Sequence, residues 1–490
     1  MTSKNEYKEI LKSTGVFGGT QIVVILSGLI KSKIVAILIG PTGVGISAVY
    51  NNILLMLGSV IGLGIGSSAI REIAKEHQKI GKIRVAKITQ NLVLYLAVIG
   101  VIVTLICSFP LSKLMFGSNN YIIGFCIISF AVFFSILSTG YDACLKGFRA
   151  IKNIALISLY SSIGNILISL IMFYFWGAKA IPVTIALNAL SILALNFFYT
   201  KKTVNTSTVK ISIRETIKEA KPMVVLGIML VISSLIEYFV INITNIVIVK
   251  KGSLAQVGLY QGAMQITNMS INLVFAAIAN DYYPRLASFC NDKVGFNNAF
   301  NTQAVITVLL MVPILNVMIV AAPVLIQLFL SKEFSSISSF LYWILSGSIF
   351  MSISWCLYYI PLAYGHTKRF LYMSIIYAIS KLLIQIPFYL FWGLKGIAIG
   401  NALTTFIYAC IAYVLYRKIY TISFHKDFFR IFAILIIFSL TILSLEILKQ
   451  NYSWLILLEI LCVGIVCLYC WIHLNKRTDI INSLISRIKK

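Results

Sequence analysis

The sequence predicts an all-α polytopic membrane protein with about 14 transmembrane helices, and three observations support this prediction. The 490-residue chain is 59% hydrophobic and only 11% charged, whereas a typical soluble protein has about 25% charged residues. Its mean hydropathy is +0.93. Its apolar residues come in runs of roughly 20 or more, long enough for a helix to cross a hydrocarbon core of about 30 Å. A soluble enzyme, a disulfide-rich secreted scaffold and a disordered chain are therefore excluded.

The apolar runs divide the chain into two lobes and a C-terminal extension. We expect residues 1–200 to form an N-terminal six-helix lobe, with spans at about 13–39, 45–70, 88–110, 120–144, 153–175 and 180–200. We expect residues 222–418 to form a second six-helix lobe, with spans at about 222–249, 257–280, 300–330, 338–364, 370–392 and 396–416. Two further helices, at about 430–449 and 453–473, and a basic cytoplasmic tail occupy residues 419–490.

Residues 201–221 are interpreted as a cytoplasmic amphipathic linker between the lobes. Ser212 and Glu215 have the spacing of a capping box, in which each residue bonds the backbone of the other. Apolar residues of the same stretch fall on one helical face, which is typical of a helix lying on a membrane surface. The tail at 480–490 repeats this pattern, with lysines and arginines beside an isoleucine-rich face.

The basic residues predict the orientation in the membrane. The formal net charge is +26, and 31 of the 41 lysines and arginines fall in the N-terminus, the C-terminus and alternate loops, against seven in the other loops. Positively charged loops stay in the cytoplasm, so we expect both termini to be cytoplasmic. The excess charge is interpreted as a topology signal and a contact for anionic lipids, and we expect no nucleic-acid partner.

An internal repeat organises the first twelve spans. Residues 175–179 read FWGAK and residues 391–395 read FWGLK, at a spacing of about 215 residues. Each repeat contains an even number of helices, so the two lobes are expected to be pseudo-symmetric about an axis along the membrane normal. This organisation favours an alternating-access transporter with its substrate site at mid-depth between the lobes. The alternative is a duplicated bundle without transport activity.

Four ionisable residues inside the spans are functional candidates, because a charge at the bilayer centre costs several kcal/mol. Lys381 lies roughly 17 Å from either end of its span, too deep for its side chain to reach water past the lipid. Its counterpart in the repeat is Asn165. Lys31 and Lys33 lie in the outer half of the first span, and Glu237 lies midway along the seventh. For Glu237, a role in coupling transport to protons and an ion pair with Lys381 both remain open.

These residues predict a cationic central groove with further amides around it. The predicted lining comprises Lys31, Lys33, Lys381, Asn51, Asn52, Asn165, Asn242, Asn245, Gln261 and Gln265. Glu446 and Glu459 lie near the outer ends of the last two spans, and we expect them to be interfacial. The scattered histidines and cysteines indicate no metal site, and we expect no catalytic residue and no cofactor.

Several short motifs, in their order along the helices, resemble those of a known family. They are GPTGVG at 40–45, KGFR at 146–149, VGLYQ at 257–261, YYPRL at 282–286 and LSKEF at 330–334. With these motifs the chain resembles the lipid-linked oligosaccharide (O-antigen type) flippases of the multidrug/oligosaccharidyl-lipid/polysaccharide exporter superfamily. The resemblance implies two six-helix lobes and a cationic central cavity.

The resemblance also implies a function. A flippase of this family is expected to move undecaprenyl-diphosphate-linked oligosaccharides from the cytoplasmic to the outer leaflet of the bacterial inner membrane, for the O-antigen of lipopolysaccharide or another surface polysaccharide. Membrane lipids, a polysaccharide polymerase and a chain-length regulator are the expected partners. Two alternatives remain: a cation-coupled multidrug exporter of the same superfamily, and a membrane polysaccharide polymerase or glycosyltransferase.

Overall fold

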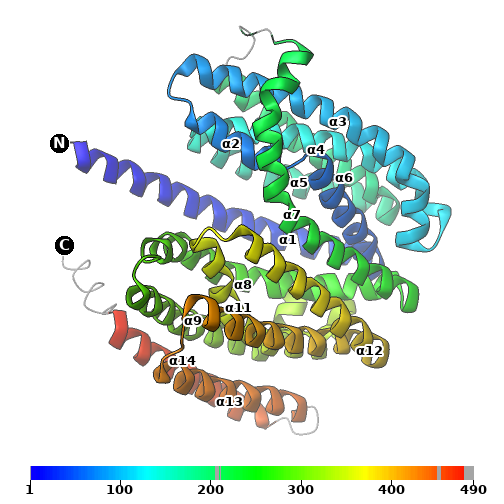
Figure 1. Cartoon of the computed structure of the whole chain (residues 1–490). Helices are drawn as coiled ribbons and strands as arrows, with labels where there is room; N and C mark the ends of the chain where they lie inside the picture. Colours follow the sequence, from blue (N-terminus) through cyan, green and yellow to red (C-terminus); the bar gives the residue numbers. More distant parts are fainter. Residues whose placement is uncertain (1, 205–208, 210, 450–453, 479–490) are drawn as a thin grey trace. The chain divides into compact units, whose positions relative to one another are not determined.

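The chain is a multi-pass, all-α membrane protein. The computed structural model describes residues 2–204, 209, 211–449 and 454–478. Over these residues it contains 14 α-helices, three short 3-10 turns and no strand (Figure 1). Within the same part of the chain, nine helices are long and apolar enough to cross a membrane, or ten if one bent pair counts as a span. The predicted fold class is confirmed.

The helices follow the predicted order of spans. The first group is α1 (Thr2–Ile61), α2 (Ile65–Lys75), α3 (Lys79–Phe116), α4 (Ile122–Gly147), α5 (Ile151–Trp176), α6 (Ile181–Thr203) and α7 (Ile213–Lys251). The second group is α8 (Leu254–Ser288), α9 (Lys293–Phe329), α10 (Ser338–Gly347), α11 (Ile349–Ala363), α12 (Thr367–Tyr420), α13 (Lys426–Leu448) and α14 (Leu455–Thr478).

Two of the long helices each contain two predicted spans joined at a glycine. In α1 the break is Gly40, with φ 62° and ψ −174°, immediately before Pro41. In α12 it is Gly393, with φ 60° and ψ −145°. Residues with a Cβ atom rarely adopt these positive φ values, whereas glycine adopts them readily. Elsewhere a predicted span is divided: the second continues from α1 into α2, and the tenth is the pair α10–α11, bent by 43°.

The chain forms two compact units. One comprises Met1–Leu259 with Phe329–Ser331, and the other comprises Tyr260–Leu328 with Lys332–Lys490. The first unit holds α1–α7 and the beginning of α8, and the second holds the rest of α8 and the helices that follow. Because α7 packs against α1, α2 and α3, it belongs with the first unit. The predicted lobe boundaries at 200, 222 and 418 stay a prediction.

A glycine contact explains the close packing of α7 on the first unit. A Cβ atom added to Gly64, which has φ 64°, would overlap the backbone oxygen of Gly227 in α7. A Cβ atom added to Gly227 would in turn overlap the carbonyl oxygen of Leu63. The two backbones therefore touch without a side chain between them, as at small-residue contacts between membrane helices.

The linker helix has the predicted cap but is not a separate element. The backbone N–H of Ser212 donates to Glu215 Oε2 at 2.9 Å, and the N–H of Glu215 donates to Ser212 Oγ at 3.3 Å, so the predicted capping box is confirmed. The amphipathic stretch forms the first turns of α7, which runs on through Pro222. Arg84 of α3 anchors it, donating to the two carboxylate oxygens of Glu219 at 2.6 and 3.1 Å. The second amphipathic helix, predicted at 480–490, falls outside the described residues.

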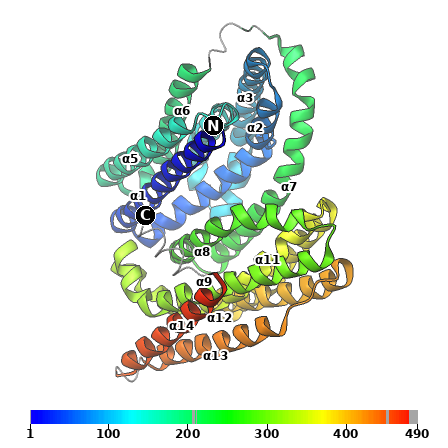
Figure 2. The ribbon, with the colours of Figure 1, turned by 90° about the vertical axis from the view of Figure 1, so that its left-hand side faces the viewer.

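In the second unit, amide side chains of α9 fix the start of the two extra helices. The backbone N–H of Ser423 donates to Asn297 Oδ1 at 2.8 Å, and that of His425 donates to Asn301 Oδ1 at 2.7 Å. Deeper in the helix, Asn316 Nδ2 donates to Ser439 Oγ of α13 at 3.0 Å. α13 and α14 then lie side by side, as Figure 2 shows.

Candidate functional site

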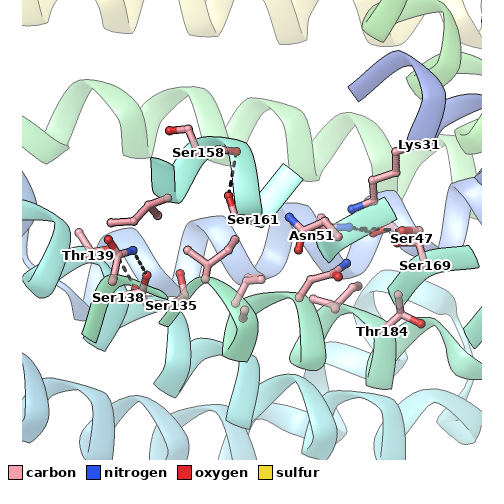
Figure 3. A pocket seen from close by; sticks show the side chains of 18 of the residues that line it. Lys31, Ser47, Asn51, Ser135, Ser138, Thr139, Ser158, Ser161, Ser169 and Thr184 are labelled. Atoms are coloured by element: carbon pink, nitrogen blue, oxygen red, sulfur yellow. Dashed lines mark hydrogen bonds between the residues drawn. The ribbon is translucent and has the colours of Figure 1, made fainter. Parts of the chain in front are cut away.

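A polar cavity of about 500 Å³ lies inside the first unit, among α1, α4, α5 and α6 (Figure 3). Its charged lining residues are Lys31 and Asp142. Its hydroxyl and amide lining residues are Ser47, Asn51, Ser135, Ser138, Thr139, Ser158, Ser161, Asn165, Ser169, Thr184, Asn188 and Asn196. Three of the predicted groove residues, Lys31, Asn51 and Asn165, therefore share one cavity.

Polar stripes on otherwise apolar helices create this lining. On α4, Ser135, Ser138, Thr139 and Asp142 have the i, i+3, i+4, i+7 spacing that places them on one face. Thr139 Oγ1 donates to the carbonyl of Ser135 at 2.9 Å, and Ser161 Oγ donates to the carbonyl of Ser158 at 3.2 Å. Because these two hydroxyls use their donors within the helix, their oxygen lone pairs remain available as acceptors for a ligand.

Lys31 supplies the uncompensated charge of the cavity. Its side chain reaches from α1 toward the polar residues, and within the described residues it has no ion pair and no hydrogen bond. Asp142, by contrast, forms an ion pair with Lys146 one turn along α4. The acidic group is therefore neutralised by its neighbour, and the cavity is cationic at the Lys31 end.

The amides of the cavity are partly engaged and partly available. Asn51 Nδ2 donates to the carbonyl of Ser47 at 2.8 Å, and Asn196 Nδ2 donates to Ser138 Oγ at 2.9 Å. Asn188 Oδ1 is buried and has no partner in the part of the chain that the structure describes. A buried acceptor without a donor is costly, so the hydroxyl or amide donor of a ligand would stabilise it.

The other candidates in the first unit lie outside this cavity. Lys33 and Asn52 are half-buried on α1. Asn242 and Asn245 are 5% and 0% exposed on α7, and Asn242 Nδ2 donates to the carbonyl of Tyr238 at 2.9 Å. The prediction that these four residues line one groove together with Lys31 stays a prediction.

Glu237, the predicted coupling residue, is an exposed side chain of α7. It forms no ion pair in the part of the chain that the structure describes. Glu237 belongs to the first unit and Lys381 to the second. The predicted ion pair between them therefore stays a prediction, as does the coupling role.

The remaining candidates belong to the second unit. Lys381 is half-buried on α12, with its Nζ 6.0 Å from the centroid of the Tyr377 ring, at the outer limit of a cation–π contact. Gln261 is half-buried and Gln265 is exposed on α8. These three residues stay predicted groove residues.

The expected interfacial depth of Glu446 and Glu459 stays a prediction, but the structure buries both side chains inside the protein. They are 3% and 0% exposed. Both carboxyl groups face the ammonium of Lys449, which lies at the end of α13 and covers them. The pairing requires contacts between α13 and α14 that the sequence pattern does not specify.

The sequence analysis also missed the serines and threonines of the cavity. The available signal was their helical spacing within apolar spans, since polar residues at i, i+3 and i+4 in a membrane helix indicate a buried or wet face. A single serine carries little information, because its hydroxyl can bond to its own helix backbone.

Comparisons with known proteins bear on the sequence and the fold. The sequence model of the polysaccharide biosynthesis protein family matches residues 34–339. The lipid III flippase of Escherichia coli (strain K12) is 28% identical over 101 residues, which are 20% of this chain and 24% of that protein. The chain thus matches about a quarter of the length of this relative.

Two solved structures share the fold. The lipid II flippase MurJ, in an inward closed conformation, superposes with a TM-score of 0.72 at 17% identity, covering 96% of this chain and 100% of that one. An inward-facing multidrug resistance MATE family transporter of the MOP superfamily superposes with a TM-score of 0.69 at 16% identity, covering 82% and 94%. At these identities the likeness establishes the fold alone.

Proposed function

The chain belongs to the polysaccharide biosynthesis protein family, and from this premise we propose that it is a flippase for lipid-linked oligosaccharides. Its substrate is an undecaprenyl-diphosphate-linked oligosaccharide, which it moves from the cytoplasmic to the outer leaflet of the bacterial inner membrane by alternating access. The product serves the synthesis of O-antigen or another surface polysaccharide, where a polymerase and a chain-length regulator act next. The protein transports and does not catalyse a covalent reaction.

The observation that carries this proposal is the position of Lys31 in a cavity of hydroxyls and amides. A diphosphate cannot cross hydrocarbon without a cationic partner, and a charge-assisted hydrogen bond to an ammonium is a strong contact of this kind. Lysine is a point charge that imposes no bidentate geometry, which suits a headgroup that must be released again. Hydroxyl lone pairs and the free Asn188 oxygen are acceptors for sugar hydroxyls.

Reconstitution tests the proposal directly. The purified protein is placed in proteoliposomes that contain a short-chain polyprenyl-diphosphate saccharide in both leaflets. A membrane-impermeant glycosidase then measures how much saccharide becomes accessible with time. We expect accessibility beyond the outer-leaflet half in liposomes with the wild-type protein and not in protein-free liposomes. Equal accessibility in both preparations would reject flippase activity.

The fold shared with the MATE transporter supports a second candidate, a cation-coupled multidrug exporter. Organic cations require an anionic site, whereas the uncompensated charge of the cavity is Lys31. We therefore place this function second. It predicts lower accumulation of a fluorescent cationic dye in cells that express the protein, and a dye level equal to that of control cells would exclude it.

A further inference from the structure

Two buried carboxyl groups share one lysine where α13 and α14 join. Glu446 of α13 and Glu459 of α14 are 3% and 0% exposed. Lys449 Nζ donates to Glu446 Oε2 at 2.8 Å and to Glu459 Oε2 at 3.1 Å. Among the described residues, these two are the buried acidic side chains of the chain. They lie outside the internal repeat and are not among the residues that line the Lys31 cavity.

The charges of this cluster do not balance when both carboxyl groups are ionised. Two carboxylates face one ammonium, which leaves one negative charge in a buried site. Among the described residues, Tyr342 of α10 also lies near Glu446, and a phenol hydroxyl adds no charge at neutral pH. Two adjacent carboxylates that cannot both be compensated retain one proton between them.

The hydrogen-bonding pattern leads to the same conclusion. The carboxyl groups of Glu446 and Glu459 are neighbours, because each has an oxygen within 3.1 Å of the same Lys449 Nζ. Carboxylates are acceptors only, so neither can donate to the other unless one carries a proton. In addition, Glu459 Oε1 is fully buried and has no partner in the part of the chain that the structure describes. A proton on the pair supplies the missing donor.

We propose that Glu446 and Glu459 form a proton-binding site that holds one shared proton, with Lys449 neutralising the remaining charge. The site joins α10, α13 and α14, so the proton contributes to the packing of the two extra helices on the second unit. The inference does not depend on the flippase proposal, because proton binding is measured without substrate.

The proton makes the stability of the protein depend on pH with a defined sign. The proposed shared proton belongs to the folded site, because in the unfolded chain the two glutamates are separated and solvated. Its stabilisation is therefore fully present in acid and is lost as the pH rises through the range in which the folded site releases the proton. Glu459→Gln replaces the protonated carboxyl with a neutral amide and should abolish this loss.

Thermal unfolding of the full-length protein in lipid nanodiscs, between about pH 5 and about pH 8, tests the site. We expect the melting temperature of Glu459→Gln to match the wild type in acid and to exceed it by several degrees at the alkaline end. The matched control is Glu333→Gln, since Glu333 is an exposed carboxyl on the short turn before α10, and it should follow the wild-type profile. A difference between Glu459→Gln and the wild type that does not change with pH would overturn the proposal.

Infrared spectroscopy provides a readout that does not require the variant to be stable. A protonated carboxyl has its own carbonyl stretching band, which the wild type should show at neutral pH and lose in alkali. Glu446→Gln or Glu459→Gln, whichever folds, should lack the band, and Lys449→Met should retain it to a higher pH. A wild-type protein without this band at neutral pH would show that both carboxyl groups are ionised.

Discussion

Gly177 and Gly393 adopt the same backbone conformation at equivalent places in the two halves of the chain. Gly177 has φ 56° and ψ −144°, and Gly393 has φ 60° and ψ −145°. Each follows a Phe-Trp pair whose tryptophan is more than half exposed, at 59% for Trp176 and 58% for Trp392. Exposed aromatic rings of this kind anchor helices at the membrane–water interface. The repeat therefore encodes a glycine turn at the interface, where one span ends and the next begins.

The positive φ of this turn predicts that replacing either glycine with alanine destabilises the protein. Because an L-residue is strained in this region, Gly177→Ala or Gly393→Ala should each cost about 1–3 kcal/mol in the free energy of unfolding. Gly164→Ala is the matched control, since Gly164 lies within α5 and an added Cβ meets open space. Thermal unfolding of the purified variants gives the comparison. Equal stability of Gly177→Ala and Gly164→Ala would mean that the turn tolerates a side chain.

The contact between α7 and the turn that joins α1 to α2 predicts a second glycine effect. A Cβ on Gly227 overlaps the carbonyl oxygen of Leu63, and a backbone atom cannot rotate away. Gly227→Ala should therefore lose about 1–3 kcal/mol by overpacking and reduce the yield of folded protein. Gly464→Ala in α14, where an added Cβ has no neighbour within 4 Å, should not. If the two variants are recovered in equal amounts, α7 is free to shift at this contact.

The cavity predicts that transport depends on the charge at position 31. Lys31→Ala should lower the rate of saccharide translocation roughly ten- to a hundredfold, the range expected for the loss of a hydrogen bond to a charged group. Lys31→Arg should restore part of the rate, because it restores the charge. Lys113→Ala, at an exposed lysine of α3, controls for net charge. Wild-type translocation by Lys31→Ala would remove this residue from the substrate site.

The capping box of α7 predicts a moderate loss of stability. Ser212→Ala removes the acceptor for the Glu215 N–H and should cost about 1 kcal/mol. Glu215→Gln keeps a side-chain acceptor for the Ser212 N–H and should cost less. Limited proteolysis between α6 and α7, compared at equal protein concentration, measures how far each change loosens the start of the helix. Faster cleavage of Glu215→Gln than of Ser212→Ala would contradict this order.

The fold could be predicted from the sequence because membrane spans can be recognised from local runs of residues, without knowledge of contacts between helices. Every backbone polar group must be bonded within its own helix, so the length and apolarity of each run were sufficient to find the spans. The cap at Ser212 could be predicted for a similar reason, since its partners lie within four residues.

The candidate site could be predicted only in part, because it depends on contacts between helices. Lys31 could be selected because a charge inside a membrane span is costly. Asn165 could be selected because it is the counterpart of Lys381 in the internal repeat. The serines of α4 and α5 did not, because a hydroxyl in an apolar helix is inexpensive when it bonds to its own backbone. The Glu446–Lys449–Glu459 cluster was missed because it forms only when α13 and α14 pack together.

The position of Glu237 separates the two roles left open for this residue. If Glu237 is only the counter-ion of Lys381, Glu237→Gln removes the partner of a half-buried ammonium, and the amount of folded protein should fall. Since Glu237 is exposed on α7 and forms no ion pair among the described residues, we expect Glu237→Gln to fold at the wild-type level.

A coupling role then predicts a selective defect in transport. Glu237→Gln keeps the shape and hydrogen-bonding capacity of the side chain but removes its titration. It should therefore bind the lipid-linked saccharide as the wild type does, while net export driven by a proton gradient is lost. The double variant Glu237→Gln/Lys381→Met is the decisive comparison, with both binding and export measured in proteoliposomes with and without a gradient. If the double variant regains both folding and export that the single variant lacks, Glu237 acts only as a counter-ion, and the proton that drives transport must bind elsewhere.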